Sequence, residues 1–525
     1  RGTHRASVVL TPLGPGLTNA ATGVANAALD SIPVVVIAGD VPTHYFGKHP
    51  HQEVNHHADA DQWQIYRPFV KRAFRVERAE LLPEILDRAF VIAESGRPGP
   101  VLVDVPMDLF SLPIEAALVD RALANHIDYA PPALDVATAE RIVTSLAAAE
   151  HPLVYAGGGV LSACASEELT TLVDLLDLPV AHSLMGKGAV SDDNPHVLGM
   201  SGFWGMPFTN QMCRGADWIL GLGTRFAEAD SSSWYEDFTF RMPPTKLIQI
   251  DIDPEQIGRN YPVEIGAVAD LKSALTTLLE AARRLYPRGV VREGVTGTIL
   301  AERAARKEAL VANQTSGEFP MNPARILKDL HDHIPADSFV VTDVGWNKNG
   351  LAQQYDISVP GTFITPGGFA TMGFGSPAAL GVQLAAPGRR VIALVGDGGF
   401  GQNPAVLATA RRERIPVVWV VMNNNAYGTI AGLEKANYGT TFGTVFESED
   451  DDMWLDYSAI AAAYGIRARK VTSPEDFGVA LDEALASGEP YLIDVPMRNI
   501  PTPTGGHWNI LDIYSPDGVK GHVST

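Results

Sequence analysis

The chain has 525 residues, of which 46% are hydrophobic and 19% charged, a composition typical of a globular protein with large buried cores. Its net charge of −21 argues against binding to nucleic-acid backbones or anionic membranes, and no apolar run approaches the ~18 residues that a membrane span needs. The two cysteines, Cys164 and Cys213, are too few for a disulfide framework or a cysteine-based zinc site, and they favour a reducing, cytoplasmic location.

The first part of the chain alternates strand-like and helix-like segments. Short β-branched runs at 7–11, 34–39 and 101–106 predict strands, and glycine-rich or acidic turns follow them. Such alternation is typical of a parallel sheet covered by helices. We therefore expect an α/β domain over residues 1–125, incomplete at its N-terminus because the sequence enters a strand almost directly after Arg1.

The same alternation recurs twice after a proline-containing linker at 127–135. A central domain is expected over 137–285, with strands at 153–156, 218–222 and 247–252, and a charged helix is expected at 302–313. A third domain is expected over 320–500, with strands at 339–342, 391–395, 417–422 and 491–495. Residues 501–525 are rich in proline and glycine and suit a tail or an active-site lid. The predicted fold is thus three doubly wound parallel-sheet α/β domains.

The segment 391–428, VIALVGDGGFGQNPAVLATARRERIPVVWVVMNNNAYG, carries the most chemistry. It predicts a strand, a glycine turn, a helix, a second strand and an asparagine-rich turn, and we expect the two strands to be parallel neighbours in the sheet. Asp397 and Asn424 then lie at the carboxyl ends of the strands, the edge where such sheets bind ligands. With the backbone carbonyl of Ala426 they offer the oxygen ligands that suit Mg²⁺, while glycine N–H groups and a helix N-terminus can face phosphates.

Simpler interpretations exist for each half of this pattern. A lone GDG is a common strand-to-helix turn and an NNN turn a common stop signal, but their occurrence at crossover spacing favours a metal–diphosphate site. Residues 185–188, MGKG, lack the spacing of a P-loop, and no G-x-G-x-x-G with a later acidic residue predicts a nicotinamide dehydrogenase.

GDG followed at this distance by NN resembles the motif of thiamine-diphosphate enzymes, in the form found in acetolactate synthase and its relatives. The segments 13–40 (LGPGLTNAATGVANAALDSIPVVVIAGD) and 367–381 (GGFATMGFGSPAALG) also resemble this family. So do GLGTRF at 221–226, IDIDPEQIGRN at 250–260 and the QE pair at 52–53. The resemblance covers nearly the whole chain.

The resemblance implies thiamine diphosphate and Mg²⁺ as cofactors and a 2-oxo acid such as pyruvate as substrate. Decarboxylation would be followed by transfer of the remainder to a second carbonyl compound. Met372 matches the residue that props the cofactor in its folded shape, Gln52 matches an active-site glutamine, and Ala370 offers a carbonyl to the pyrimidine amine. The family's catalytic glutamate would lie before Arg1, so no residue is assigned to it. The remaining residues implied to bind the cofactor are Gly14, Pro15, Gly16, Asn19, Gly396, Gly398, Gly399, Tyr427 and Gly428.

Three positions depart from the acetolactate-synthase pattern. Leu433 stands where the family has a tryptophan that shapes the acceptor pocket, His51 stands for a phenylalanine, and Asn347 stands for a histidine that faces the diphosphate. We hypothesise that His51 donates a proton and favours aldehyde release over ligation. A zinc site among the five histidines of 44–61 is the weaker interpretation of that segment.

Several alternatives stay open at this point. A non-ligating 2-oxo acid decarboxylase is the nearest rival function, and a non-catalytic cofactor-binding subunit is a rival of another class. The resemblance also leaves FAD as a further cofactor of the central domain, with Arg225 as its expected contact, and glycines 157–159 suit either a nucleotide or strand-end packing. A homodimer or homotetramer is implied by the family, with neither a nucleic-acid nor a membrane partner.

Overall fold

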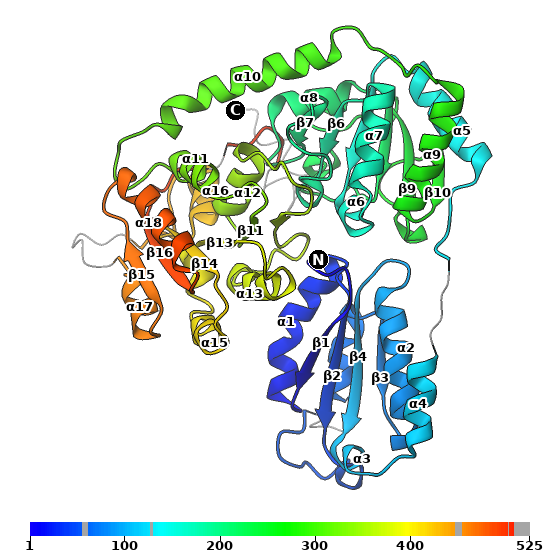
Figure 1. The fold of residues 1–525 in the computed structure, drawn as a ribbon, viewed down its shortest axis with the longest axis vertical. Helices are drawn as coiled ribbons and strands as arrows, with labels where there is room; N and C mark the ends of the chain where they lie inside the picture. Colours follow the sequence, from blue (N-terminus) through cyan, green and yellow to red (C-terminus); the bar gives the residue numbers. More distant parts are fainter. Residues whose placement is uncertain (55–60, 126–129, 447–453, 502, 509–525) are drawn as a thin grey trace. The chain divides into compact units, whose positions relative to one another are not determined.

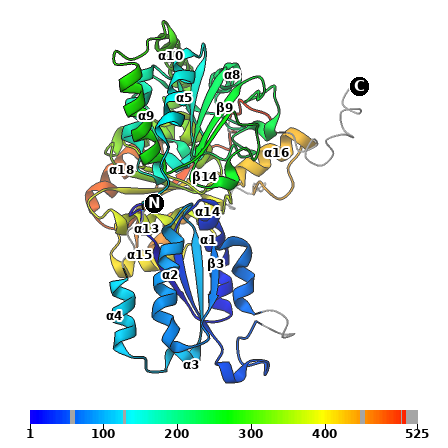
Figure 2. The same cartoon turned by 90° about the vertical axis from the view of Figure 1, so that its right-hand side faces the viewer.

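The computed structural model describes residues 1–54, 61–125, 130–446, 454–501 and 503–508. The chain divides into two compact units. The N-terminal unit holds residues 1–131 together with Pro366–Thr371, and the C-terminal unit holds residues 132–365 and the chain from Met372 onward. Three sheets, whose paired strands all run parallel, build the units, as the sequence predicts (Figures 1 and 2).

The N-terminal unit contains a four-stranded sheet in the order β1-β2-β4-β3. Side chains of β2 alternate between two cores: Val34 and Val36 pack with α1, whereas Val35 packs with α2 on the other face. The two helices therefore cover opposite faces of the sheet. The elements of this unit are β1 (Ser7–Thr11), α1 (Pro15–Leu29), β2 (Val34–Asp40), η1 (Thr43–Tyr45), η2 (Gln62–Phe69), β3 (Arg72–Arg75), η3 (Ala79–Leu81), α2 (Leu82–Glu94), β4 (Pro100–Pro106), α3 (Met107–Phe110) and α4 (Ala116–Ala124).

The central sheet has six strands in the order β10-β9-β8-β5-β6-β7. Its middle strands β5 and β8 are apolar and largely buried, because α5, α7 and α9 pack on one face and α8 and α10 on the other. The strands are β5 (Pro152–Ala156), β6 (Val180–His182), β7 (Val197–Met200), β8 (Trp218–Leu222), β9 (Lys246–Asp251) and β10 (Ile265–Val268). The helices are α5 (Val136–Ala148), α6 (Gly158–Ser162), α7 (Ser166–Leu176), α8 (Pro207–Gly215), α9 (Leu271–Leu285) and α10 (Val295–Gln314), with η4 (Leu184–Gly186), η5 (Ser232–Trp234) and η6 (Pro254–Gln256) between them.

The third sheet also has six strands, in the order β12-β11-β13-β14-β16-β15. Helices α11, α12 and α18 pack on one face and α13, α15 and α17 on the other. The strands are β11 (Phe339–Thr342), β12 (Phe363–Ile364), β13 (Val391–Gly396), β14 (Val418–Asn423), β15 (Arg467–Lys470) and β16 (Tyr491–Pro496). The helices are α11 (Pro323–His333), α12 (Trp346–Gln354), α13 (Gly375–Ala385), α14 (Asp397–Phe400), α15 (Val406–Glu413), α16 (Gly428–Tyr438), α17 (Tyr457–Ala463) and α18 (Pro474–Ser487).

The ten strands predicted from apolar runs are confirmed to within about a residue at each end. The charged helix expected at 302–313 is also confirmed, inside the longer α10. Strands without such a run were missed, among them β3, whose sequence RAFR places an arginine at each end. The single helix expected after the GDG turn is instead the one-turn α14 followed by a separate α15.

Residues 503–508, which belong to the predicted tail, lie against the central domain. The N–H groups of Gly505 and Gly506 donate to the carbonyls of Gly205 and Phe203 at 3.0 and 3.2 Å. The ring of His507 stacks on Phe238, with centroids 4.3 Å apart. No helix in the described parts of the chain is both long and apolar enough to cross a membrane.

Candidate cofactor and metal site

The predicted metal ligands come together at the carboxyl edge of the third sheet. Strands β13 and β14 are parallel neighbours, with Gly396 opposite Met422. Asp397 follows the first strand and Asn424 follows the second, so both side chains leave the sheet at one edge. This is the juxtaposition that the crossover spacing predicts.

Three oxygen atoms converge at this edge. The position of the Asn424 amide oxygen lies 3.1 Å from Asp397 Oδ1 and 2.9 Å from the Ala426 carbonyl oxygen, while the amide nitrogen faces Asn499 Oδ1 at 3.2 Å. Three acceptors this close repel one another unless a cation lies between them or the amide turns over to donate to both. Oxygens on an octahedral Mg²⁺ at about 2.1 Å would be about 3 Å apart, so the oxygen arrangement fits this ion.

The environment of Asp397 matches the role of a ligand held ready for a cation. The residue is buried, and burial raises the pKa of its carboxyl group to about 6, opposed by the N–H groups of Gly398 and Ala426. Bound Mg²⁺ would reverse this effect by stabilising the carboxylate. Among the described residues no group of three or more His, Cys, Asp or Glu side chains could hold a metal, so a site here depends on the amide and the carbonyl as well.

Two buried aspartates behind this edge were not singled out from the sequence. Asp494 on β16 accepts from Asn423 Nδ2 at 3.1 Å and from the Tyr457 N–H at 2.9 Å, which fixes the residue before Asn424. Asp343 accepts from the N–H groups of Gly373 and Gly375 at 3.1 and 2.7 Å, on either side of the turn after Met372. Asp343 carries the same signal as Asp397, an acidic residue directly after a buried strand.

The predicted diphosphate glycines pack closely against their neighbours. A Cβ atom on Gly398 would lie 2.6 Å from the Tyr427 ring and 3.2 Å from Met372 Cε, so these three predicted residues are adjacent. A Cβ atom on Gly399 would lie 2.6 Å from the Asp343 carboxylate, and one on Gly428 would lie 2.7 Å from Asn424 Nδ2. Gly396 has more room. Close packing therefore requires glycine at 398, 399 and 428 even before a ligand is considered.

In the N-terminal unit the GPG turn meets the QE loop. Gly14 has a φ of +57°, and a Cβ atom there would lie 2.4 Å from the Gln52 carbonyl oxygen. Pro15 is the first residue of α1, followed by Gly16, and Asn19 is exposed on the same helix. His51 is exposed beside Gln52. The turn and the predicted active-site loop are thus in direct contact.

Ala370 lies in the short segment 366–371 that clusters with the N-terminal unit. It adopts a φ of +50°, unusual for a residue with a side chain. The segment is anchored by Asp30, whose carboxylate oxygens accept from the N–H groups of Gly367 and Gly368 at 3.0 and 3.1 Å. The strained backbone is what a carbonyl aimed at a ligand can require, although the sequence alone gives no sign of it.

Comparisons with known proteins agree with this geometry. Family models of thiamine pyrophosphate enzymes match the chain in three parts: the N-terminal TPP binding domain at residues 1–60, the central domain at 139–278 and the C-terminal TPP binding domain at 343–495. A probable acetolactate synthase large subunit of Methanocaldococcus jannaschii is 34% identical over 100% of this chain and 87% of its own length. The acetolactate synthase isozyme 3 large subunit of Escherichia coli is 33% identical over 92% of this chain and 82% of its own. The chloroplastic acetolactate synthase of Arabidopsis thaliana is 32% identical over 94% and 72%.

The chain belongs to the thiamine pyrophosphate enzymes. Its two outer domains match the TPP binding domains of the family, so thiamine diphosphate is its cofactor. The predicted resemblance to acetolactate synthases is confirmed at 32–34% identity by the three relatives above, two of which are named as large subunits.

The positions that depart from the acetolactate-synthase pattern lie at or near the predicted site. Leu433 is half-buried on α16, the helix that follows the asparagine turn. Asn347 is buried at the start of α12, its Nδ2 3.5 Å from the Cβ position of Gly396, and its Oδ1 has no hydrogen-bond partner among the described residues. A buried amide oxygen without a protein partner beside the GDG turn fits a site that receives a polar ligand group.

The glycine turns of the central domain are explained by packing. A Cβ atom on Gly157 would lie 2.1 Å from the Gly223 carbonyl oxygen, and the Gly157 and Gly159 N–H groups donate to the carbonyls of Leu222 and Gly223. Arg225 lies near Asp230 and contributes to lowering its pKa against the effect of burial, which raises it to about 6. The N–H groups of Gly157 and Gly159 at this turn are thus already bonded to the protein.

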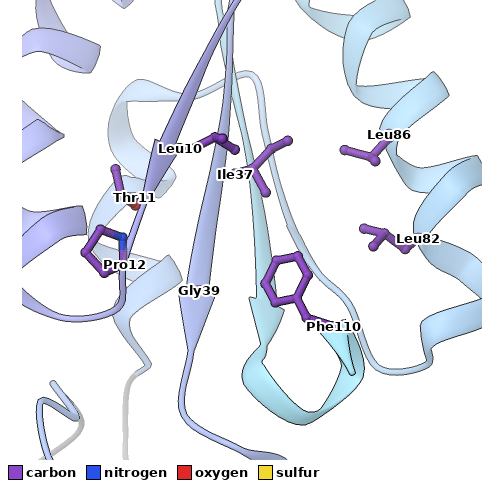
Figure 3. A pocket seen from close by; sticks show the side chains of 8 residues that line it. All are labelled: Leu10, Thr11, Pro12, Ile37, Gly39, Leu82, Leu86 and Phe110. Carbon is purple, nitrogen blue, oxygen red and sulfur yellow. The ribbon is translucent and has the colours of Figure 1, made fainter. Parts of the chain in front are cut away.

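An apolar hollow of about 480 Å³ lies in the N-terminal unit (Figure 3). Its walls come from β1, β2, α2 and α3, and Thr11 is its one side chain that carries a hydrogen-bonding group. It offers no acid, base or nucleophile. The lining residues are Leu10, Thr11, Pro12, Ile37, Gly39, Leu82, Leu86 and Phe110.

Proposed function

We propose that the protein is a Mg²⁺-dependent enzyme that decarboxylates a 2-oxo acid resembling pyruvate and joins the remainder to a second carbonyl compound. The single observation that carries the metal assignment is the convergence of the Asp397, Asn424 and Ala426 oxygens at spacings suited to Mg²⁺. The relatives' names, acetolactate synthase large subunit, supply the reaction class.

The proposed site residues form two groups: those that hold the metal ion and those that shape the space around the reacting atoms. Asp397, Asn424 and the Ala426 carbonyl would hold Mg²⁺ and, through it, the diphosphate of the cofactor. When bound, thiamine diphosphate supplies the nucleophilic carbon and accepts the electron pair left when carbon dioxide departs.

The second group shapes the space around the reacting atoms. Met372, adjacent to Gly398, would support the folded cofactor, and the Ala370 carbonyl would accept from its pyrimidine amine. Gln52, held over Gly14, would face the substrate. This group orients the reactants and limits the entry of water, and orientation is a large part of catalysis in enzymes that use cofactors.

The nearest alternative is a decarboxylase that releases an aldehyde. Two observations favour it: Leu433 replaces the tryptophan of the acceptor pocket, and the exposed His51 can carry a proton toward the site. A non-catalytic subunit is not favoured, because all three proposed oxygen ligands are present and lie close together. FAD is left out of the proposal because the glycine turns are filled by their own packing.

The test is a product analysis of the protein with Mg²⁺, thiamine diphosphate and pyruvate. Carbon dioxide and acetolactate appearing in equal amounts would support the proposed synthase, and carbon dioxide with aldehyde would support the decarboxylase. Absence of turnover with a panel of 2-oxo acids, despite tight cofactor binding, would contradict both. From the family resemblance we further propose a homodimer or homotetramer in the cytoplasm, which light scattering and fractionation can check.

A further inference from the structure

A buried polar network lies beneath the GPG turn of the N-terminal unit, and Gln62 is at its centre. The Gln62 side chain is 3% exposed and links the ends of three strands. Its Oε1 accepts from the Gly14 N–H at 2.9 Å, and its Nε2 donates to the Gly39 carbonyl at 2.7 Å and to Asp104 Oδ1 at 2.7 Å.

The orientation of the Gln62 amide is fixed by the backbone. A backbone N–H can only donate and a backbone carbonyl can only accept, so Oε1 must face Gly14 and Nε2 must face Gly39. The second hydrogen of Nε2 then points at Asp104 Oδ1, which must act as an acceptor. Any proton on the Asp104 carboxyl group therefore sits on Oδ2.

Asp104 and Asp40 form an unequal pair. Asp104 is completely buried, and no donor group among the described residues faces its Oδ2; its side chain instead shares a hydrogen bond with the Asp40 side chain, which requires a proton on one of the two. Asp40, the neighbouring carboxyl group, accepts from the Val41 N–H at 2.7 Å and lies 3.8 Å from the Arg75 guanidinium. The Val41 N–H and the Arg75 guanidinium can therefore stabilise a negative charge on Asp40. Asp104 is the carboxyl group of the pair that we expect to carry a proton.

The electrostatics of the pair agree with this division. Burial, followed by the charge of Asp40, raises the pKa of Asp104 to about 8, against the lowering effects of Gln62 and Arg75. Among the described residues, Asp61 also carries a charge near the pair, and it shares Arg75 with Asp40. Burial also raises the pKa of Asp40, against the lowering effects of the Val41 N–H, Asp104 and Arg75, so the contacts of the pair favour a neutral Asp104 beside an ionised Asp40.

We propose that Gln62 is a positioning residue for the Gly14 turn and the Gln52 loop packed on it, and that Asp104, as a neutral acid beside Asp40, holds Gln62 in place. The proposal rests on the proposed function, because it assigns the Gly14 turn to the cofactor. The chain of contacts runs from Asp40 through Asp104 and Gln62 to Gly14, and the Gln52 backbone lies against that glycine.

The experiment compares the dissociation constant of thiamine diphosphate, with saturating Mg²⁺, for the wild-type protein and four variants. Asp104→Asn mimics the neutral acid, since its Oδ1 can still accept from Gln62, and it should bind within about twofold of wild type. Gln62→Ala and Asp104→Ala leave buried polar groups unpaired and should each weaken binding about tenfold or more. Gln64→Ala, on the same turn of η2 as Gln62, is the matched control and should leave binding unchanged.

The dependence of cofactor affinity on pH distinguishes this proposal from a purely structural role of Asp104, because a structural role predicts no change in affinity when Asp104 loses its proton. Wild-type affinity should fall as the pH rises from 7 to 9, because loss of the Asp104 proton leaves two buried carboxylates side by side and their repulsion displaces Asp104 together with Gln62; the affinity of Asp104→Asn should stay level. If Asp104→Asn binds as weakly as Asp104→Ala, or Gln62→Ala binds as wild type, the proposal is overturned. Circular dichroism of each variant separates loss of folding from loss of binding.

A measurement without cofactor separates this proposal from the proposed function. The native pKa of Asp104 lies above its unfolded value, so the native state binds the extra proton between pH 4 and 8 and its contribution to stability is lost as pH rises through 8. The melting temperature of wild type relative to Asp104→Asn should therefore decline over that range. If wild type fails to bind thiamine diphosphate but shows this decline, the function is wrong and the protonated pair stands; a flat difference would refute the pair.

Discussion

The Asp30 carboxylate accepts a hydrogen bond from the N–H of Gly367, 337 residues further along the chain, at 3.0 Å. This bond, with its companion to Gly368, attaches the segment carrying Ala370 to the N-terminal unit. A residue predicted to contact the pyrimidine from the third domain is thereby held by the first. Asp30 thus anchors the beginning of the segment that carries Ala370.

We predict that Asp30→Ala lowers the free energy of unfolding by roughly 2–3 kcal/mol, because it removes a nearly buried carboxylate that accepts two backbone N–H groups. Urea denaturation of the purified protein measures this. Glu77→Ala, an exposed acidic residue of the same unit, is the control and should change stability little. Equal stabilities of Asp30→Ala and wild type would show that the 366–371 segment is held by other contacts.

The metal assignment predicts a specific dependence on pH. Burial raises the pKa of Asp397 to about 6 in the metal-free protein, and Mg²⁺ binds its ionised form. The apparent Mg²⁺ affinity should therefore be level above pH 7 and fall toward tenfold per pH unit well below 6, because protons compete for the carboxylate. Isothermal titration at several pH values would measure it.

Removal of the ligand itself gives the complementary result. Asp397→Asn should weaken Mg²⁺ binding at least about tenfold at pH 7.5, since a neutral amide replaces the one formal negative charge of the ligand set. Asp494→Asn, one strand away, should weaken it less, because Asp494 acts through Asn423. The assignment is wrong if Asp397→Asn retains wild-type affinity.

These residues also show what the sequence can and cannot predict. Asp397 and Asn424 were predictable because each follows a long apolar strand, and the parallel crossover brings the two strand ends together. Gln62 and Asp40 were not predictable, because the role of Gln62 depends on its contacts with three strand ends that are far apart in the sequence. A glycine in the sequence indicates that another group packs closely against the backbone there, but it does not identify that group. At Gly399 the neighbour is the Asp343 carboxylate.

The fold was more predictable than the site for a related reason. Burial on both faces of a sheet leaves uninterrupted apolar runs, and these identified every central strand of the third sheet. Edge strands such as β3 and β15 carry arginines and lack that signal. The bond from Asp30 to Gly367 joins parts of the chain that no local pattern connects.

The proton-donor hypothesis for His51 yields a product ratio. His51→Phe restores the family's residue and should shift products from aldehyde toward the ligated compound, because the exposed imidazole no longer supplies a proton. His49→Phe, two residues earlier, is the control and should leave the ratio as in wild type. The ratio of aldehyde to ligated product, measured by chromatography, decides it, and an unchanged ratio in His51→Phe would refute the hypothesis.

The last prediction concerns the contact between the central and third domains. Lys187 Nζ donates to Asp192 Oδ2 at 2.8 Å, and the Ile357 N–H donates to the same oxygen at 2.7 Å. Both charged side chains are buried, and although burial favours the neutral acid, Lys187 holds the pKa of Asp192 below its usual value. Lys187→Met would leave Asp192 buried and unpaired, which should cost roughly 3–5 kcal/mol of unfolding free energy.

The chain provides its own control for this pair. Lys307 and Asp356 join the same two domains at 2.7 Å, but the lysine side chain is 59% exposed. Lys307→Met should therefore cost less than about 1 kcal/mol, since solvent-exposed ion pairs contribute little. Denaturant titrations of the two variants side by side would show the difference. Equal losses of unfolding free energy in the two variants would mean that burial does not determine the strength of these ion pairs. The large cost predicted for Lys187→Met would then be wrong.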